Sequence, residues 1–307
     1  MKAAYFERHG GPEVIRYGDL PDPEAGPGEI VVDIHAASVN GADCKVLSGR
    51  YSQVAAFPYV LGRDFSGVVA ALGDGADGFA PGDPVFGVCE VGQEGAYAEK
   101  IAMKAALVAR KPDSLSHVDA AALALIGLTA VVSIEDTLAL QSGERILIQG
   151  GAGGVAGFAI ELAKHIGAHV IATCSARNID YVRGLGADEA IDYNAQDFVE
   201  AVSDCDAVFE TVGGDVAQRS FAVLRPGGRA AFIASGSTAP EPPRGDLTAL
   251  RPKVGRDRPH LLRILELVEA DAVRVPKIRT YPLADAASAL ATSAARHLRG
   301  KLVLSIR

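Results

Sequence analysis

The spacing of hydrophobic positions changes near residue 119. Up to about residue 112 the apolar runs are short and are separated by glycine and proline turns, and Val32 and Ile34 alternate with Asp33 and His35. Such alternation predicts strands with one wetter face. We therefore expect a small antiparallel β domain here, with His35 on its polar face rather than acting as a ligand.

Beyond residue 119, helical and strand patterns alternate. The predicted strands are 145–149, 169–173, 190–192, 207–210 and 229–234, and the predicted helices are 155–166, 179–185, 197–202 and 216–224. Strands that recur beyond intervening helices predict an α/β fold with a doubly wound parallel sheet and right-handed crossovers.

The C-terminal part returns to the first pattern. Residues 238–258 predict a surface loop with one extended piece, and 259–268 predict a helix. The tail from 275 is β-like, and the alternation in 300–306 predicts an edge strand of the first domain. We thus expect domains at 1–117 plus 275–307 and at 118–274, the second inserted in the first.

Residues 145–164 combine a buried strand, a glycine turn and an amphipathic helix. Gly151 and Gly153 are able to adopt positive φ and carry no Cβ, so the main chain can approach a pyrophosphate at the helix start. Ala156 completes the pattern G-x-G-x-x-A, a form of the dinucleotide fingerprint. The alternative is a plain turn; the strand at 169–173, at the distance of a βαβ unit, favours dinucleotide binding.

The end of the second strand discriminates between the two dinucleotides. An acid there accepts the ribose hydroxyls of NAD, but residues 173–178 contain none. Ser175 and Arg177 instead offer a hydroxyl and a guanidinium to a phosphate monoester, which favours NADPH. Arg177 as a solvated loop residue is the alternative. Tyr193 is a candidate to close over the adenosine end.

Composition and charge limit the binding partners and the cellular compartment that we expect for this chain. The chain has 307 residues, 49% apolar, and a formal charge of −8, which argues against nucleic acid or an anionic membrane as main partner. Residues 1–8 lack a signal-peptide core, and we expect no later run long enough to cross a bilayer. The four scattered cysteines predict a reducing compartment, and hence a cytoplasmic protein.

Two short segments of the first domain offer further candidates. Asn40 and Asp43 are able to cap a short helix at 44–47. Tyr51 and Tyr59 flank a loop whose aromatic rings suit a flat ligand, with packing as the alternative role.

Many ordered pieces together resemble one family. They are residues 38–43, 61–67, 81–85, 95–99, 127–130, the glycine turn, 185–188, 211–214 and 300–304. Over nearly its whole length the chain resembles the medium-chain dehydrogenase/reductase superfamily, in its zinc-free quinone oxidoreductase branch related to zeta-crystallin. The resemblance implies a Rossmann domain inserted in a β-rich GroES-like domain. It also implies a homodimer formed through an added strand at the sheet edge, for which 250–254 is our candidate.

The zinc-dependent members of that superfamily place a cysteine where this chain has Asn40, and Gly-His-Glu where it has Gly62, Arg63 and Asp64. An amide is a poor zinc ligand and a guanidinium repels the cation. The four-cysteine structural lobe is missing as well. We therefore expect no metal.

Without zinc, the implied chemistry is hydride transfer from NADPH to a small-molecule quinone or α,β-unsaturated ketone. By resemblance, Asn40 and Thr129 orient the nicotinamide ribose, and Tyr51 and Tyr59 contact the acceptor carbonyl. The other implied cofactor contacts are Gly153, Gly154 and Val155 at the pyrophosphate and Val212, Ile233, Ala234 and Ser235 at the nicotinamide half.

No catalytic triad or carboxylate pair is recognisable, so we expect water to supply the final proton. Two alternatives stay open. One is reduction of an alkenal or enoyl double bond by the same hydride step. The other is a non-catalytic NADPH-binding protein, crystallin-like or sensing.

Overall fold

The computed structural model describes residues 1–51, 54, 56–90, 92–296 and 298–307. The chain divides into two compact units, residues 1–125, 256–262 and 277–307 in the first and 126–255 and 263–276 in the second. The divisions near 125 and 262 fall inside helices α2 (His117–Val131) and α7 (Arg258–Glu269). They differ from the expected boundaries at 117/118 and 274/275 because the first half of α2 and residues 256–262 pack with the first unit.

The described residues of the first unit form a seven-stranded and a three-stranded sheet. The larger has the order β15-β16-β3-β5-β6-β8, with β7 paired to β3; the smaller has the order β2-β1-β4. Neighbouring strands are antiparallel except β15 and β16. The strands are β1 (Lys2–Phe6), β2 (Arg16–Asp19), β3 (Glu29–Val39), β4 (Tyr59–Val60), β5 (Asp64–Leu72), β6 (Pro84–Val88), β7 (Lys100–Lys104), β8 (Val108–Arg110), β15 (Ile278–Pro282) and β16 (Lys301–Ser305).

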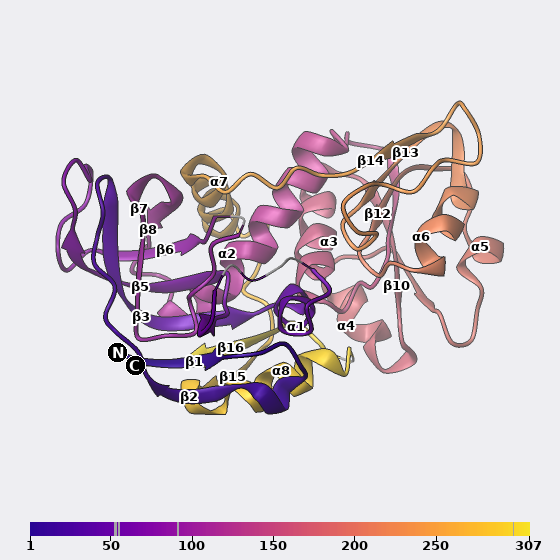
Figure 1. The fold of residues 1–307 in the computed structure, drawn as a ribbon. Helices are drawn as coiled ribbons and strands as arrows, with labels where there is room; N and C mark the ends of the chain where they lie inside the picture. The colour runs from indigo at the N-terminus through magenta and orange to yellow at the C-terminus, as the bar shows by residue number, and fades with distance from the viewer. Residues whose placement is uncertain (52–53, 55, 91, 297) are drawn as a thin grey trace. The chain divides into compact units, whose positions relative to one another are not determined.

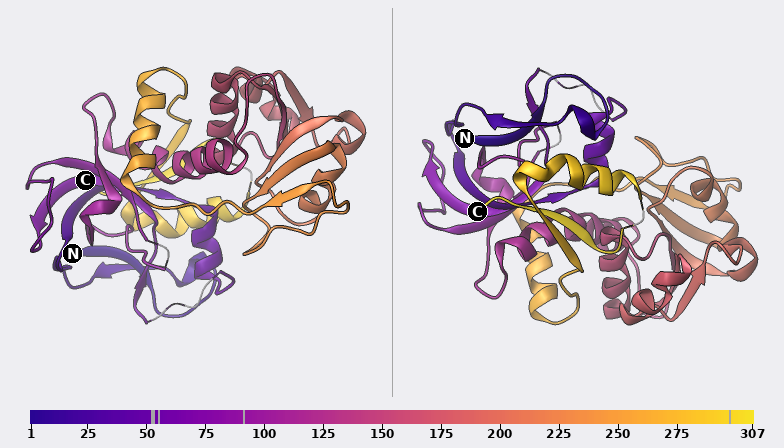
Figure 2. Two further views of the ribbon diagram at one scale, coloured as in Figure 1. Left: turned by 90° about the horizontal axis from the view of Figure 1, so that it is seen from above. Right: turned by 90° about the horizontal axis from the view of Figure 1, so that it is seen from below.

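The prediction that 300–306 form an edge strand is wrong. β16 lies between β15 and β3, as the yellow and indigo segments show in Figure 2. Leu302, Val303 and Leu304 are all buried although they point to alternate faces. β16 pairs on both sides, parallel with β15 and antiparallel with β3, which makes it an inner strand.

Helices complete the first unit. They are α1 (Gly41–Leu47), α8 (Ala286–Ala294) and the short 3-10 turns η1 (Pro12–Val14), η2 (Ala105–Leu107) and η6 (Leu283–Asp285). The β-like prediction for the tail missed α8, whose small residues pack with α1 and β16 around the fully buried Leu290. In the first half of α2, Ala121 and Ala122 pack against Ala36 and Val303 of the sheet.

The second unit is built on a six-stranded sheet among the residues described, with the order β11-β10-β9-β12-β13-β14 and all neighbours parallel. This confirms the predicted doubly wound parallel sheet. Figure 1 shows α3 and α4 on one face of it and α5 and α6 on the other. The elements are η3 (Val132–Thr137), β9 (Arg145–Ile148), α3 (Gly154–Ile166), β10 (His169–Cys174), η4 (Ala176–Asn178), α4 (Ile179–Gly184), β11 (Glu189–Asp192), α5 (Phe198–Ala201), β12 (Cys205–Glu210), α6 (Asp215–Arg219), η5 (Ser220–Val223), β13 (Leu224–Phe232) and β14 (Thr248–Leu250).

The extended piece expected within 238–258 is present, but it does not coincide with the candidate dimer strand 250–254. The strand is β14, which ends at Leu250 and pairs with β13. Pro252 has no backbone N–H to donate to a ladder, so the strand ends before it.

The expectation of no run long enough to cross a bilayer is wrong by length and composition. Within the described ranges, one helical stretch, residues 117–137, spans 21 residues with a mean hydropathy of 1.9. Its most apolar window is 72% buried inside the protein, as in a core helix. The apolar side chains of this stretch are thus largely used in packing.

Leu290→Ala is predicted to destabilise the protein by about 2–5 kcal/mol, because Leu290 is fully buried in α8 and its truncation leaves a cavity. The matched control is Leu262→Ala in α7, where the side chain is 44% exposed and a change of about 0.5 kcal/mol or less is expected. Urea unfolding of both variants gives the comparison. Equal losses would contradict the assignment of α8 to the core.

Candidate functional site

The turn between β9 and α3 is fastened to the end of β10. Gly150 N donates to Thr173 Oγ1 at 3.1 Å, and Gly151 N donates to the Thr173 carbonyl at 2.8 Å. The Thr173 hydroxyl donates in turn to Gln149 Oε1 at 2.6 Å, and both of these side chains are buried. These hydrogen bonds within the protein therefore hold the turn in its shape before any ligand binds.

The glycines of this turn differ in their roles from the prediction. Positive φ occurs at Gly150 (75°), whereas Gly151 and Gly153 do not use the positive φ that glycine permits. Gly151 is required for space, because a Cβ there would lie 3.1 Å from Ala172 Cβ and from Ile160 Cδ1. Gly153 is the N-cap of α3 with φ −75°, and a Cβ on it would meet only the Gly150 carbonyl oxygen, at 3.4 Å.

The start of α3 has the properties of an anion site. The N-cap is a glycine without a side chain to bond the helix amides. The first amides of the helix, which include those of Gly154 and Val155, have no acceptor within it, and they lie at the positive end of the helix dipole. Ala156 is 1% exposed, which allows α3 to pack closely on the sheet. A dinucleotide's pyrophosphate fits this corner.

The predicted adenosine contacts gather at the neighbouring strand ends. Ser175 and Arg177 follow β10 directly, and Arg177 is exposed in η4. Ser175 Oγ accepts from Asn178 Nδ2 at 3.1 Å. Tyr193 follows β11, donates its backbone N–H to the Cys174 carbonyl at 3.1 Å and is 50% exposed. The structure thus brings these residues to adjacent strand ends.

The predicted nicotinamide contacts also lie at adjacent strand ends. Val212, 41% exposed, follows β12, and Ile233, Ala234 and Ser235 follow β13. Ser235 Oγ donates to the Thr238 carbonyl at 3.0 Å.

A buried acid that the sequence analysis missed shapes this end of the sheet. Glu210 Oε1 accepts from the backbone N–H groups of Val212 at 2.6 Å and Gly213 at 2.7 Å. Burial raises the pKa of Glu210. Because its partners are backbone amides in a turn, no residue type in the sequence signalled the role.

Thr129 lies half-buried in the part of α2 that belongs to the second unit. Its carbonyl accepts from Ser133 Oγ at 2.6 Å. Asn40, Tyr51 and Tyr59 belong to the first unit, so the predicted residues form two groups, one in each unit.

Asn40 is held at both ends of its amide. Its Nδ2 donates to Asp64 Oδ1 at 2.8 Å, and its Oδ1 accepts from Lys301 Nζ at 2.7 Å. Lys301 has only donors and the Asp64 carboxylate has only acceptors, so this orientation of the amide follows from its partners. The expected helix cap is also present, since Asn40 N donates to Asp43 Oδ2 at 2.8 Å at the start of α1.

Asp64 and Lys301 are fully enclosed on either side of Asn40. Asp64 also accepts from Ser38 Oγ at 2.7 Å and from Leu125 N at 3.2 Å, while Lys301 Nζ donates to the Val39 carbonyl at 2.9 Å. Burial raises the pKa of Asp64 and lowers that of Lys301, and their opposite charges oppose both shifts. The sequence analysis missed Lys301, which is 261 positions from Asn40; its only signal was the piece at 300–304.

Arg63 contacts two acidic side chains near Asn40 and Asp64. Its guanidinium donates to Glu94 Oε1 at 2.9 Å and lies 3.5 Å from Asp43 Oδ1. Tyr97 donates its hydroxyl to Asp43 Oδ2 at 2.6 Å. The Arg63 guanidinium also lies 4.6 Å from the centroid of the Tyr51 ring. Although burial alone would lower the pKa of Arg63, the two carboxylates raise it.

These residues do not fit a zinc ion. The Asn40 amide is engaged at both ends, Arg63 is a cation, and Asp64 is surrounded by hydrogen-bond donors. In the described part of the chain, no three His, Cys, Asp or Glu side chains are grouped so that they could hold a metal.

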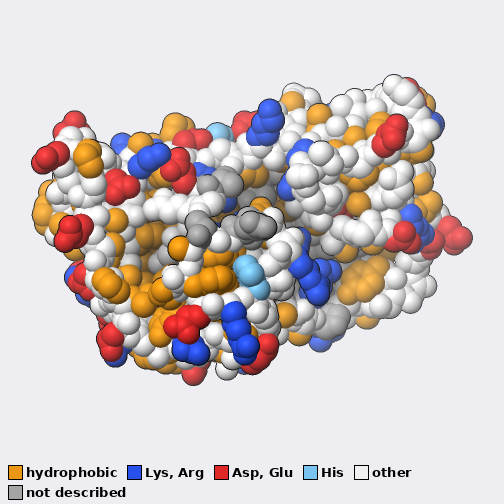
Figure 3. All heavy atoms as spheres, viewed as in Figure 1, with side chains coloured by type: hydrophobic (Ala, Val, Ile, Leu, Met, Phe, Trp, Pro, Cys, Tyr) orange, Lys and Arg blue, Asp and Glu red, His pale blue; other side chains and the backbone are white. Residues whose placement is uncertain are grey.

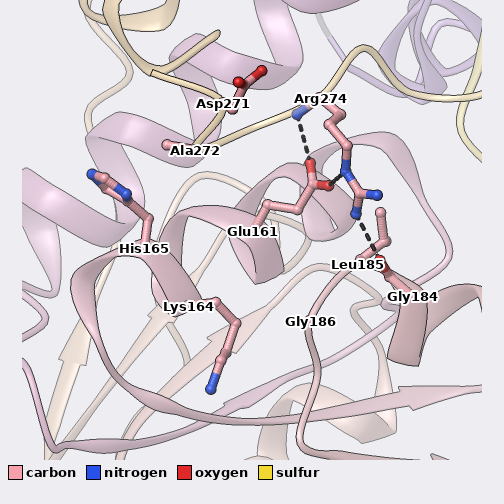
Figure 4. Close-up of a pocket in the computed structure, with 9 residues that line it drawn as sticks. All are labelled: Glu161, Lys164, His165, Gly184, Leu185, Gly186, Asp271, Ala272 and Arg274. Carbon is pink, nitrogen blue, oxygen red and sulfur yellow. Dashed lines mark hydrogen bonds and ion pairs between the residues drawn. The ribbon is translucent and has the colours of Figure 1, made fainter. Parts of the chain in front are cut away.

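A separate surface cavity of about 510 Å³ lies beside the later turns of α3 (Figure 4). Arg274 crosses it, with Nε 2.6 Å from Glu161 Oε1 and Nη2 donating to the Gly184 carbonyl at 2.6 Å. None of the predicted site residues lines it. Its lining residues are Glu161, Lys164, His165, Gly184, Leu185, Gly186, Asp271, Ala272 and Arg274.

Surface charge gives no separate indication of a site. On the face drawn in Figure 3, acidic and basic side chains are interspersed rather than gathered by sign. The face drawn therefore shows no basic stripe of the kind typical of nucleic-acid binding.

Comparisons with known families match two stretches of the chain. Residues 26–113 match the alcohol dehydrogenase GroES-like domain, and residues 185–304 match a family described as zinc-binding dehydrogenase. The ligand set described above does not support carrying the zinc of that description to this chain.

Relatives and solved structures cover the full length. The chain is 31% identical to the mouse protein named NAD(P)H oxidoreductase RTN4IP1, mitochondrial, over 100% of this chain and 89% of that protein. It is similar to the quinone oxidoreductase of Coxiella burnetii, with a TM-score of 0.94 and 33% identity over 100% and 99% of the two chains. It is also similar to Escherichia coli quinone oxidoreductase complexed with NADPH, with a TM-score of 0.91 and 27% identity over 100% of both chains.

Two family models and full-length relatives at this identity agree with the motifs and the fold. The chain belongs to the medium-chain dehydrogenase/reductase superfamily, in its zinc-independent quinone oxidoreductase branch.

Proposed function

We propose that this enzyme uses NADPH to reduce a quinone or an α,β-unsaturated carbonyl compound without zinc. The observation that carries the proposal is the β9–α3 corner, where a Cβ on Gly151 would crowd Ala172 Cβ and Ile160 Cδ1 at 3.1 Å and the glycine N-cap leaves the first helix amides to an anion. The likeness to an oxidoreductase solved with NADPH supports this choice of cofactor.

When bound, NADPH supplies the hydride, and the protein positions it. In this proposal Gly153, Gly154 and Val155 hold the pyrophosphate through the amides of Gly154 and Val155, because the Gly153 N–H already donates to the Gly150 carbonyl at 3.0 Å. Ser175 and Arg177 hold the 2′-phosphate, and Tyr193 covers the adenosine. Val212 and residues 233–235 contact the nicotinamide half, with Thr129 at its ribose.

The hydrogen bonds of the Asn40 amide limit how this side chain can contact a ligand. Because Nδ2 donates to Asp64, and more weakly to Ser38, a ligand would meet this side chain at Oδ1, which already accepts from Lys301. Asn40 therefore acts as an acceptor, from a ribose hydroxyl or the nicotinamide amide. Lys301 fixes the direction of that oxygen.

Tyr51 and Tyr59 are the proposed contacts of the acceptor. Tyr51 is 49% exposed and Tyr59 is half-buried, so both are accessible from outside the first unit's core. Their rings suit a flat acceptor and their hydroxyls suit its carbonyl oxygen. Oxidation of NADPH with a panel of quinones and enones tests the activity, and binding without turnover on every acceptor would favour the non-catalytic alternative.

Assembly and compartment complete the proposal. A homodimer would use β14, for which β13 is the one pairing strand among the described residues. All four cysteines are free thiols, which suits the cytoplasm, whereas the mouse relative is named as mitochondrial.

Arg177→Ala is predicted to weaken NADPH binding about 10- to 100-fold, because the variant loses a charge-assisted contact to the 2′-phosphate. NADH, which lacks that phosphate, should bind as before. Calorimetric titration measures the binding of both coenzymes. Arg225→Ala is the control, because Arg225 lies at the start of β13, whereas the proposed cofactor contacts follow the ends of the strands. Equal losses for the two coenzymes would remove this assignment.

Chelation is predicted to leave activity unchanged, because neither Asn40 nor Arg63 is a zinc ligand. Metal analysis after treatment with a chelator, alongside the rate of NADPH oxidation, checks this. Stoichiometric zinc lost together with activity would contradict the metal-free proposal.

A further inference from the structure

One carboxyl group holds the turn after β12. Glu210 is the last residue of β12 and is fully buried. Its Oε1 accepts from the backbone N–H groups of Val212 at 2.6 Å and Gly213 at 2.7 Å. These two N–H groups belong to the peptide planes on either side of the Val212 Cα, and a peptide plane is rigid. Holding both planes therefore fixes the direction in which the Val212 side chain leaves the turn.

Glu210 also holds the turn after β13. Its carbonyl accepts from Ile233 N at 3.1 Å. Gly213, with a φ of 82°, lies so close to this second turn that a Cβ on it would be 2.9 Å from the Ala234 carbonyl oxygen. One buried residue thus fixes two neighbouring turns, the one that contains Val212 and the one formed by residues 233–235.

The turn after β12 is connected to the glycine turn after β9 as well. Thr211 Oγ1 donates to the Gln149 carbonyl at 2.8 Å. A Cβ on Gly150 would lie 3.2 Å from Val212 Cγ2, so the Val212 side chain lies beside that glycine. Since Val212 is 41% exposed, its apolar surface is accessible to a ligand bound at these strand ends.

The burial of the Glu210 carboxyl is unfavourable for stability. Its Oε2 is enclosed and has no hydrogen-bond partner within the described ranges. A buried polar oxygen without a partner lowers the free energy of unfolding. Residues that reduce stability in this way are found at functional sites, where the geometry that they impose is needed.

We propose that Glu210 is a positioning residue for the nicotinamide half of NADPH. The proposal rests on the proposed function, which assigns Val212 and residues 233–235 to that half of the cofactor. Glu210 is enclosed and acts through the two turns rather than by touching the ring. Without its side chain, the Val212 and Gly213 amides lose their acceptor, and the turn must be ordered when the cofactor binds.

The first test separates the two halves of the cofactor. In Glu210→Ala, the affinity for NADPH is expected to fall about 10-fold, because the turn is no longer ordered before binding. The affinity for adenosine 2′,5′-bisphosphate, which has the adenine and the 2′-phosphate but no nicotinamide, should match wild type. Calorimetric titration measures both ligands. A general loss of structure would weaken both of them.

Asp206→Asn is the matched control. Asp206 lies near the start of the same strand and also accepts from a backbone N–H, that of Arg145, at 2.7 Å. Its hydrogen bonds are therefore of the same kind but lie far along β12 from Val212. Asp206→Asn should reduce stability to urea while both ligands bind as in the wild type.

Glu210→Gln tests whether the acceptor oxygen is the important group. Its Oε1 can still accept from the two amides, so the affinity for NADPH should stay within about threefold of wild type. Its amide nitrogen would take the place of Oε2, which is enclosed without a partner, so this variant should unfold at a lower urea concentration. Loss of stability without loss of affinity would separate positioning from folding.

Turnover gives a further readout. A displaced nicotinamide transfers its hydride slowly, so kcat of Glu210→Ala should fall about 10- to 100-fold at saturating NADPH. Asp206→Asn should keep the wild-type kcat. Should Glu210→Ala not fold, Gly213→Ala gives the same comparison, because its methyl group would push against the Ala234 carbonyl while Glu210 stays in place.

Two results would overturn the positioning role. One is wild-type affinity for NADPH and wild-type kcat in Glu210→Ala, or in Gly213→Ala if only that variant folds. The other is an equal loss of affinity for NADPH and for the bisphosphate. If the wild-type protein itself does not bind NADPH, the proposed function fails together with this inference.

Discussion

The buried ammonium of Lys301 is the interaction on which the first unit's site depends. It is joined to Asp64 through the Asn40 amide, and the side chains of Asp64 and Lys301 are buried while Asn40 is half-buried. Removing one member of such a set leaves a polar group without its partner. The loss of stability caused by that unpaired group is far larger than the net stabilisation that the pair provides. The arrangement therefore fixes the Asn40 oxygen and also joins the C-terminal strand to the start of α1.

The same region shows how a site works with side chains that do not bind a metal. Where related dehydrogenases have zinc ligands, this chain has an amide and an arginine, both held by neighbouring charges. In the proposed function the fixed charges bind ligands, and no Lewis acid activates an alcohol. This favours acceptors that take a hydride readily, since quinones and enones need little polarisation.

In the second unit, backbone groups have the central role. Thr173 and Gln149 hold the turn after β9, and Glu210 holds the turn after β12, so each loop has its shape before a ligand arrives. Preorganised amides cost little to reorient on binding, which is the physical advantage of such a corner. The exposed Val212 and Tyr193 then offer apolar surface at the same ends of the strands.

The sequence by itself determined the parallel sheet, the glycine corner and the family, because hydrophobic periodicity and glycine spacing are local signals. It also placed Ser175 and Arg177 correctly after β10, since a residue that follows a strand stays at that strand's end. Only the tertiary structure decided that Gly150 rather than Gly151 takes positive φ and that β16 is an inner strand. Only it brought Lys301 to Asn40 and Glu94 to Arg63. These pairings join distant parts of the chain, and burial, which no single segment encodes, sets the charge that each acid and base carries.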